Sequence, residues 1–483
     1  MPATLQACLV LVLLCPVAEG AAAVEESRTT YPNILLVVSD DHSAPHVGCY
    51  GNPDVRTPVL DRLSQHGILC RRAYVTAPQC VPSRASILTG RMPLEIGLCR
   101  FSDNLRREVK ILPEYLSQVG YFTGLCGRAY HLDGSGDANR PAIRALLTQD
   151  ELPNIKERVD FCRVAGHPNL GEQALKQMQE FLDQKPADRP FFLQLCWSDP
   201  HRGWDDAPKP DPIDPRQLTL PETYPDTPGV RKDLAEYYNE INRLDAHTGR
   251  ALEVLREREL YDNTIVVFIG DNGGSQFRGK GTLNELGIWV PLIIRLPHDE
   301  HAGTELTPLV SAEDLVPTLL EAIGLSIPSE ITGKSFYPGL AGRDYEAREY
   351  VFAERMGHTA ALPVNSSAFD LGRAVVSERF KRIYNCIWQL PYTPVDFDHA
   401  PFFNHLKKRN GAGELSELHS RLYFSDRAMF ELYDLAEDPL ELNNLAGSAE
   451  AREVENRLRT VLSAQMMRAH DFLPPPIPGK KGW

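Results

Sequence analysis

Continuous apolar runs along the chain predict buried strands. The first run covers residues 33–39 and is followed directly by Asp40 and Asp41. A strand without polar alternation is typical of a parallel sheet whose two faces are both covered. Comparable runs follow at residues 121–126, 191–197, 264–269 and 292–295.

Helical patterns with an apolar stripe separate these runs, at residues 59–66, 112–119, 170–182, 233–256 and 312–323. Alternating strands and helices predict an α/β fold with a doubly wound sheet. Ligands of such sheets bind beyond the carboxyl ends of the strands. Four predicted strand ends carry polar residues, which places a candidate site there: Asp40-Asp41, Gly127-Arg128, Asp199-Pro200-His201 and Asp271-Asn272.

The pattern changes near residue 345. Short strand-like segments follow at 350–353, 374–376, 380–384 and 430–433, before a closing helix at 449–470. We therefore predict a catalytic α/β domain over residues 21–345 and a smaller antiparallel C-terminal α+β subdomain over residues 346–483. Residues 205–228 contain seven prolines, so we expect an extended surface loop that borders the site.

The N-terminal apolar run at residues 5–18 is followed by Glu19, Gly20 and three alanines. This pattern predicts a signal peptide over residues 1–20 and a secreted, periplasmic or lysosomal protein. A positively charged start is missing, and a buried N-terminal helix is the alternative. No other run reaches the ~20 apolar residues that a membrane span needs, so we expect none.

Composition narrows the function classes. The chain is 42% hydrophobic and 24% charged, as in ordinary globular proteins. Its formal net charge of −14 argues against nucleic acid as a partner, because phosphate backbones need a basic face. The ten cysteines include no C-x-x-C pair, which argues against a zinc ribbon or a thioredoxin-type motif.

The most specific string is at residues 80–84, which read C-V-P-S-R. Here the chain resembles the type I sulfatase family, whose members have an alkaline-phosphatase-like fold. In that family a maturation enzyme oxidises this cysteine to formylglycine. The resemblance implies that Cys80 becomes formylglycine, whose hydrate supplies a recyclable nucleophilic hydroxyl that a thiol cannot. We expect Cys80 to begin a helix whose amides, with Arg84, favour an anion.

Two polar pairs form a second group of candidate site residues. Asp40-Asp41 and Asp271-Asn272 each follow a predicted strand, and four oxygen-bearing side chains suit a hard divalent cation. The resemblance implies the same four ligands, with calcium as the ion. Such an ion would polarise a bound sulfate.

The resemblance implies roles for further residues. His131 would assist the hydrate, and Arg128 stands where the family usually has a sulfate-binding lysine. His201 would be the general acid that protonates the leaving group. Lys280 would be a second sulfate-binding cation, with Arg278 as its near competitor.

Substrate selectivity is expected from polar groups around the sulfate pocket. The predicted substrate-binding residues are Arg202, His358 and Arg373, and further candidates are Arg100, Asp103, Asn104 and Trp204. Residues 198–202 and 227–235 resemble heparan sulfamidases, which implies N-sulfated glucosamine in heparin or heparan sulfate. The alternatives are an O-sulfatase on a glycosaminoglycan or another sulfated sugar, a phosphonate or phosphate monoester hydrolase, and a non-catalytic glycan-binding protein.

Overall fold

A computed structural model describes residues 31–100, 104–128, 155–165, 170–205, 207–358 and 368–476. His131, Asp103 and the predicted signal peptide over residues 1–20 lie outside the described residues. None of the helices in the described ranges is both long and apolar enough to cross a membrane.

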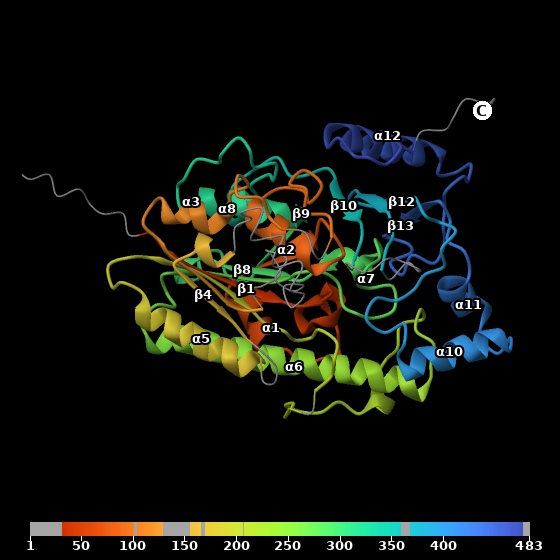
Figure 1. Cartoon of the computed structure of the whole chain (residues 1–483), viewed down its shortest axis with the longest axis horizontal. Coiled ribbons are helices and arrows are strands. Elements are labelled where there is room, and N and C mark those ends of the chain that lie inside the picture. Colours follow the sequence, from red (N-terminus) through yellow and green to blue (C-terminus); the bar gives the residue numbers. More distant parts are fainter. Residues whose placement is uncertain are drawn as a thin grey trace, which may run out of the picture. The chain divides into compact units, whose positions relative to one another are not determined.

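A nine-stranded, mostly parallel sheet has the strand order β4-β3-β5-β1-β6-β8-β2-β7, with β9 beside β2 (Figure 1). β1 (Asn33–Ser39) lies between β5 (Phe191–Cys196) and β6 (Thr264–Gly270) and is parallel to both. β3 (Phe122–Gly127) pairs in parallel with β5 and with β4 (Phe161–Val164). The carboxyl ends of these strands therefore meet at one edge, and the predicted α/β fold is confirmed.

The other half of the sheet is antiparallel in places. β8 (Leu292–Arg295) runs antiparallel to β6, unlike the parallel arrangement that its apolar run indicated. The chain between β6 and β8 forms only the one-turn helix α7 (Glu285–Ile288) and β7 (Trp289–Val290). That segment stays near the carboxyl edge of β6, so β8 returns in the opposite direction.

Three strands in this half, β7 among them, were not predicted. β2 (Ile68–Tyr74) pairs antiparallel with β7 and β8, and in parallel with β9 (Thr304–Ser311). Among the described strands, β2 is therefore the one that joins β9 to the rest of the sheet.

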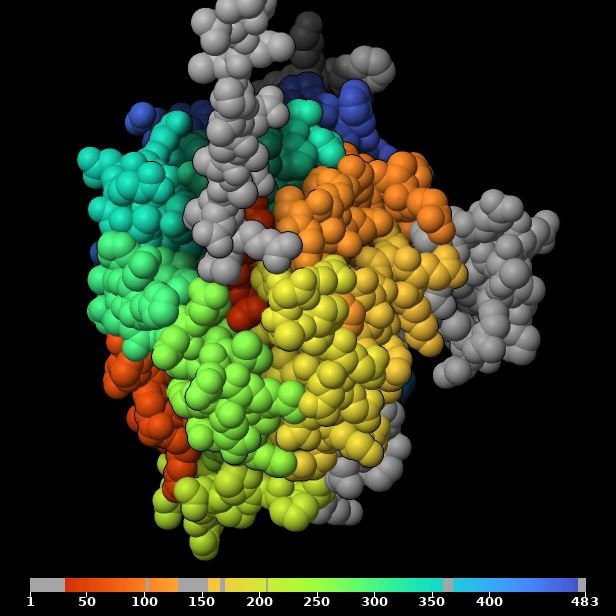
Figure 2. Space-filling model, turned by 90° about the vertical axis from the view of Figure 1, so that its left-hand side faces the viewer, coloured from red at the N-terminus to blue at the C-terminus, as the bar shows by residue number. Residues whose placement is uncertain are grey.

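Helices cover both faces of the sheet, which confirms the doubly wound prediction (Figure 1). One face carries α1 (Pro58–Gln65), α5 (Leu170–Gln184) and α6 (Pro228–Glu257). The other face carries α2 (Cys80–Thr89), α3 (Leu112–Ser117) and α8 (Leu315–Ala322). Figure 2 shows yellow and green surfaces of the α5–α6 layer side by side, and α5 packs against α6.

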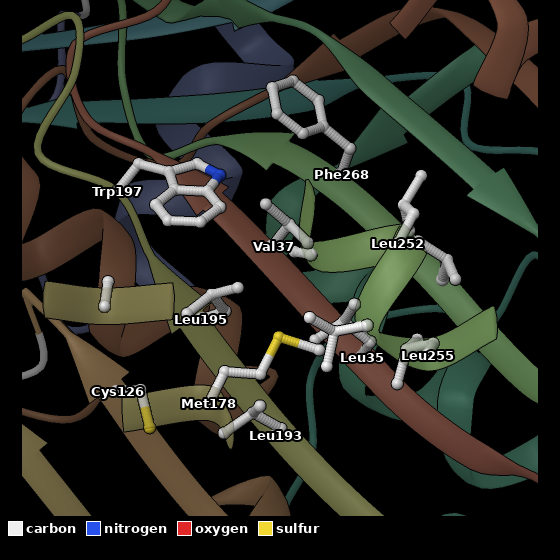
Figure 3. Close-up of a cluster of buried hydrophobic side chains, with 14 of the residues drawn as sticks. Leu35, Val37, Cys126, Met178, Leu193, Leu195, Trp197, Leu252, Leu255 and Phe268 are labelled. Carbon is white, nitrogen blue, oxygen red and sulfur yellow. The ribbon is translucent and has the colours of Figure 1, made fainter. Parts of the chain in front are cut away.

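A hydrophobic core fills the space between the sheet and the α5–α6 layer. Leu35 and Val37 of β1 point to the same face because strand side chains alternate. Figure 3 shows them beside Met178 of α5 and Leu252 and Leu255 of α6. Burying each such side chain stabilises the fold by about 1.5–3 kcal/mol. This packing fixes β1, and with it the residues that follow β1.

A four-stranded antiparallel sheet forms in the C-terminal part, in the order β10-β11-β12-β13. Its strands are β10 (Val351–Arg355), β11 (Gly372–Val376), β12 (Phe380–Asn385) and β13 (Phe430–Asp434). The predicted smaller antiparallel sheet is thus present. The boundary between residues 345 and 346 stays a prediction, because residues 32–483 form one compact unit.

Helices complete the C-terminal part. α12 (Arg452–Arg468) packs on the antiparallel sheet through Leu458, Leu462 and Met466. α10 (Pro401–Gly411) and α11 (Glu417–Phe424) lie between β12 and β13 in the sequence. The segment between β12 and α10 reaches the carboxyl ends of β1 and β6, where Lys280 joins its Asp396 to Asp41.

Candidate active site

Four polar side chains meet at the carboxyl ends of β1 and β6. Ser39 pairs with Gly270 in the parallel register, so Asp40-Asp41 and Asp271-Asn272 leave the sheet side by side. All four residues are fully buried. The backbone N–H of Asp41 donates to Asp271 Oδ1 at 2.9 Å, and Asn272 Nδ2 donates to Asp41 Oδ1 at 2.9 Å. The pairing of two strands thus builds the acidic cluster.

Cys80 is the first residue of α2, and its thiol faces this cluster. The Sγ atom lies 3.5 Å from Asp40 Oδ1 and 3.7 Å from Asp41 Oδ1. Pro82 is compatible with the first helical turn, where the backbone N–H has no partner within the helix. Burial raises the pKa of the Cys80 thiol well above its usual range, so the unmodified side chain is neutral.

Two arginines, which come from different elements, bind carboxylates of the acidic cluster. Arg84, one turn into α2, donates from Nε to Asp271 Oδ2 at 2.8 Å and lies 3.3 Å from Asp40 Oδ2. Arg128, which follows β3, places Nε 2.9 Å from Asp40 Oδ2. Burial on its own would lower the pKa of Arg84, but Asp271 and Asp40 raise it well above its usual range. Arg84 therefore stays charged.

Lys280 supplies a third cation, which is buried. Its Nζ donates to Asp41 Oδ2 at 3.0 Å and to Asp396 Oδ2 at 2.8 Å. Burial would lower the pKa of Lys280, but the two carboxylates raise it well above its usual range. Arg278, the competing candidate, donates instead to the carbonyl oxygen of Glu441 at 3.1 Å. The geometry therefore favours Lys280 as the residue of this loop that faces the cluster.

His201 lies just beyond β5 and faces the same space. Its Nδ1 lies 2.6 Å from the carbonyl oxygen of Arg202, which assigns the proton of the neutral ring to Nδ1. Its Nε2 lies 3.8 Å from Asp41 Oδ2 and 3.9 Å from Asp396 Oδ2. Burial, followed by the nearby cations, lowers the pKa of His201 to about 3. An anion bound beside the ring would raise this pKa.

Asp396 is a site residue that the sequence did not indicate. It lies on the segment between β12 and α10, and its carboxylate contacts Lys280. His358, a predicted substrate-binding residue, places Nε2 4.0 Å from Asp396 Oδ1. No motif surrounds Asp396. The only sequence signal is that the two residues beside it, Val395 and Phe397, are apolar within a loop.

Arg202 and Arg373, which were predicted to bind substrate, each form an ion pair with a carboxylate. Arg202 donates to both carboxylate oxygens of Asp233, at 2.5 and 2.7 Å. Arg373 does the same with Asp471, at 2.5 and 2.9 Å, and is only 2% exposed. Bidentate pairs of this kind are strong and geometrically specific, so both arginines stabilise the fold around the site, and their roles in substrate binding stay predictions.

Other predicted residues have different outcomes. Trp204, a candidate for stacking on a sugar, donates from Nε1 to Asp233 Oδ1 at 3.1 Å and lies under the Arg202 guanidinium. Arg100 and Asn104 stay predictions.

The acidic cluster has the properties of a hard cation site. Among the described side chains, Asn272 Oδ1 is buried without a hydrogen-bond partner. Ligand atoms of Asp40, Cys80 and Asp271 lie within 4.8 Å of one another. Burial raises the pKa of Asp41 to about 7 and that of Asp271 to about 6. A divalent cation would favour the ionised form of both.

The charge balance fits an anionic ligand once such a cation is present. Among the described residues of the site, the Cys80 thiol and the histidines are neutral, and the charged side chains are Asp40, Asp41, Asp271, Asp396, Arg84, Arg128 and Lys280. Four carboxylates and three cations give a net charge of −1 when all are ionised. A bound dication changes this to +1, which attracts an anion.

Comparison with known proteins agrees with this chemistry. Residues 32–325 match the family model described as Sulfatase, and residues 273–390 match the one described as N-sulphoglucosamine sulphohydrolase, C-terminal. N-sulphoglucosamine sulphohydrolase of Homo sapiens is 28% identical over 481 residues, which cover 91% of this chain and 90% of the relative. An ulvan-active sulfatase of Formosa agariphila is 26% identical over 462 residues, covering 94% and 83%.

A solved structure shares the fold. It is that of a protein in complex with its substrate D-glucosamine-2-N,6-O-disulfate, with a TM-score of 0.67 and 19% identity. The match covers 93% of this chain and 100% of the other.

Proposed function

The chain belongs to the sulfatase family, and from that premise we propose that it is a sulfamidase, which removes the N-sulfate of glucosamine in heparin or heparan sulfate. The observation that carries the proposal is the position of Cys80, whose sulfur lies 3.5 Å from a buried carboxylate of the acidic cluster. Cations on three sides of the cluster can hold the sulfate oxygens.

We propose that Asp40, Asp41, Asp271 and Asn272 hold calcium. A bound calcium ion would supply positive charge that polarises the sulfate group. The donor set supports this choice, because calcium prefers carboxylate and amide oxygens. The buried Asn272 Oδ1, which has no hydrogen-bond partner among the described residues, offers one such ligand.

In this proposal a maturation enzyme converts Cys80 to formylglycine, which supplies the nucleophilic hydroxyl. Arg84, Arg128 and Lys280 bind the sulfate oxygens and stabilise the negative charge that grows on them. His201, protonated when the anionic substrate raises its pKa, donates the proton on Nε2 to the departing nitrogen. His131 keeps its predicted role in assisting the nucleophile.

Two observations support an N-sulfate as the bond that is cleaved. The C-terminal family match bears the name of a sulfamidase, and so does a relative that spans 91% of the chain. The second candidate is an O-sulfatase on a sulfated sugar, which the ulvan-active relative favours. Residues 1–20 remain our proposed signal peptide, and N-terminal sequencing of the exported protein tests that assignment.

The decisive experiment compares the hydrolysis of three compounds. Enzyme produced together with a formylglycine-generating enzyme is incubated with glucosamine N-sulfate, glucosamine 6-O-sulfate and an aryl phosphonate. We expect sulfate release from the N-sulfate. Release from the O-sulfate alone would identify an O-sulfatase, and turnover of the phosphonate alone would identify a phosphonate hydrolase.

The matched control is Cys80→Ala. We expect this variant to keep its fold, measured by circular dichroism, and to lose turnover, because no nucleophile remains. Normal turnover by pure variant protein would contradict the proposed nucleophile. Mass spectrometry of the wild-type peptide distinguishes an aldehyde from a thiol at position 80. A thiol in active wild-type enzyme would contradict the proposed maturation.

A further inference from the structure

Asp396 joins the candidate site from a distant part of the chain. It lies 116 residues after Lys280, yet its Oδ2 accepts a hydrogen bond from the Lys280 Nζ at 2.8 Å. The same oxygen lies 3.9 Å from His201 Nε2, and Oδ1 lies 4.0 Å from His358 Nε2. About a quarter of its side chain (26%) is exposed, whereas that of Asp41 is fully buried. Asp396 therefore faces the accessible side of the lysine.

The backbone at Asp396 is held in an unfavourable conformation. Its φ angle is +69°, in the left-handed region that costs energy for a residue with a Cβ. Its neighbours are fixed: the carbonyl oxygen of Val395 accepts a hydrogen bond from Ser275 Oγ at 3.1 Å. Phe397 is 2% exposed and stacks on Phe402 at a centroid distance of 5.6 Å. This packing maintains the position of the Asp396 carboxylate.

A carboxylate is an unexpected neighbour for a pocket that binds an anion. Asp396 places negative charge beside Lys280 and weakens the attraction of that lysine for sulfate. Lys280 already has a carboxylate partner, since Asp41 accepts from its Nζ at 3.0 Å. The need to hold Lys280 in place therefore does not explain the presence of Asp396. A hydrogen-bond donor on the substrate would explain it.

We propose that Asp396 is a specificity-determining residue, which accepts a hydrogen bond from the N–H of a sulfamate and so selects N-sulfates over O-sulfates. The inference rests on the proposed function of the site. The bridging nitrogen of a sulfamate carries a hydrogen atom, whereas the bridging oxygen of a sulfate ester carries only lone pairs. A carboxylate attracts the N–H of the sulfamate and repels the lone pairs of the ester oxygen. One residue therefore favours the N-sulfate and disfavours the O-sulfate.

The positions of Asp396 and His201 suit this contact. Because Asp396 Oδ2 and His201 Nε2 are 3.9 Å apart, one atom can lie within hydrogen-bond distance, about 3 Å, of both. When the S–N bond breaks, its electron pair stays on nitrogen and the sulfuryl group passes to the nucleophile at position 80. The proton from His201 Nε2 completes the amine. As the nitrogen takes this proton it gains positive charge and becomes a stronger donor, so the contact with Asp396 strengthens during the step.

The test is the substitution Asp396→Asn, which removes the charge and nearly keeps the shape. Kinetics are measured with glucosamine N-sulfate and with an aryl O-sulfate. We expect the ratio of the two kcat/KM values to fall about 10- to 100-fold in favour of the O-sulfate. The matched control is Asp398→Asn on the same segment, because the Asp398 carboxylate lies against His399. This control should keep the wild-type ratio.

A second measurement does not depend on turnover. Calorimetry compares the binding of glucosamine, a cationic amine, with that of glucose, which lacks the amine. Wild-type enzyme should prefer glucosamine, and Asp396→Asn should lose this preference.

The outcomes separate the inference from the proposed function. An equal loss on both substrates would mean that Asp396 only positions Lys280 or His201, and it would overturn the inference. An unchanged ratio together with an unchanged glucosamine preference would also overturn it, while an N-selective wild type would leave the proposed function intact. A wild type that releases sulfate only from O-sulfated sugars would overturn both.

Discussion

The proposed calcium ligands differ in whether their substitution would leave a buried charge without a partner. Asp40, Asp41 and Asp271 are buried, and each contacts at least one cation. Removing one of them would leave a buried cation with fewer partners, which is strongly destabilising in its own right. Asn272 carries no charge. It is therefore the proposed ligand whose removal reports on metal binding with the least disturbance of the charge balance.

We predict that Asn272→Ala weakens calcium binding by about 10-fold or more, since loss of an outer-shell contact alone costs that much. Titration calorimetry measures the affinity directly. The rise in Tm on adding calcium should also shrink, because the stabilisation by a ligand that binds only the folded state falls with the logarithm of its affinity. Asn284→Ala, which alters the residue just before α7, is the control. Equal calcium affinity in the Asn272 and Asn284 variants would rule out Asn272 as a ligand.

Individual elements depend on polar contacts that the sequence patterns do not reveal. The start of α1 is held by Asp245 of α6, whose two carboxylate oxygens accept hydrogen bonds from the amides of Val59 and Leu60, at 3.0 and 2.8 Å. These amides have no partner within their own helix. The residue before α1, Thr57, makes no such side-chain contact with the helix amides. A residue 185 positions away thus caps the helix.

The charge on Asp245 makes this contact sensitive to pH. Burial raises its pKa to about 7, against the lowering effect of the two amide bonds, while an aspartate in an unfolded chain titrates near ~3.9. Between these values the folded protein keeps a proton that the unfolded chain has released. Stability contributed by this group is therefore present at low pH and lost as the pH rises toward 7.

We predict that Asp245→Asn removes this dependence. Urea unfolding should show that the variant becomes more stable relative to the wild type as the pH rises from 5 to 8. The exposed Asp188→Asn provides the comparison. A difference that stays constant with pH, or moves toward the wild type, would show that Asp245 is not held in the protonated form.

Strands that are apolar on both faces could be predicted from the sequence, and mixed ones could not. β1 and β6 are fully buried, so their composition reveals them. β2 carries Arg71 and Arg72 in its middle, and β9 begins with exposed residues. Neither has an apolar run, and strand pairing with distant segments decides their structure. Local sequence also contains no information on whether β8 runs parallel or antiparallel to β6.

The residues of the candidate site likewise divide into those that the sequence predicts and those that it does not. Cys80 and Arg84 lie in one short motif, and the acidic pairs follow predictable strands, so their convergence could be expected. Asp396 is a single aspartate in a loop. Its importance depends on contacts with Lys280 and His201, and only the folded chain brings these residues together.

At the scale of the whole molecule, the C-terminal sheet is joined to the larger sheet around the site. The amide of Glu354 in β10 donates to the carbonyl oxygen of Thr76 at 2.8 Å. Gln79, the residue before Cys80, donates to the carbonyl oxygen of Gly357 at 2.7 Å. The segment that leads to the nucleophile is therefore fixed by both sheets, and His358 follows directly after this contact.

A buried lysine provides a charged link between the two parts. Lys381 of β12 is fully buried, and its Nζ lies 2.7 Å from Glu285 Oε1 in α7 and 2.7 Å from Glu441 Oε1. Glu441 Oε2 also accepts a hydrogen bond from the backbone amide of Glu285 at 2.9 Å. One cation thus holds two carboxylates from segments that are 156 residues apart.

We predict that Lys381→Met lowers the free energy of unfolding by about 3–5 kcal/mol, because two partly or fully buried carboxylates lose their cation while the apolar stem is kept. Calorimetric unfolding measures this, and the transition should remain single if the two sheets unfold together. Arg379→Met, two residues earlier, removes an exposed cation from Asp434 and should cost less than about 1 kcal/mol. Similar losses in both variants would show that the buried link contributes no more than a surface pair. Two separate transitions in the Lys381 variant would instead show that this link alone couples the sheets.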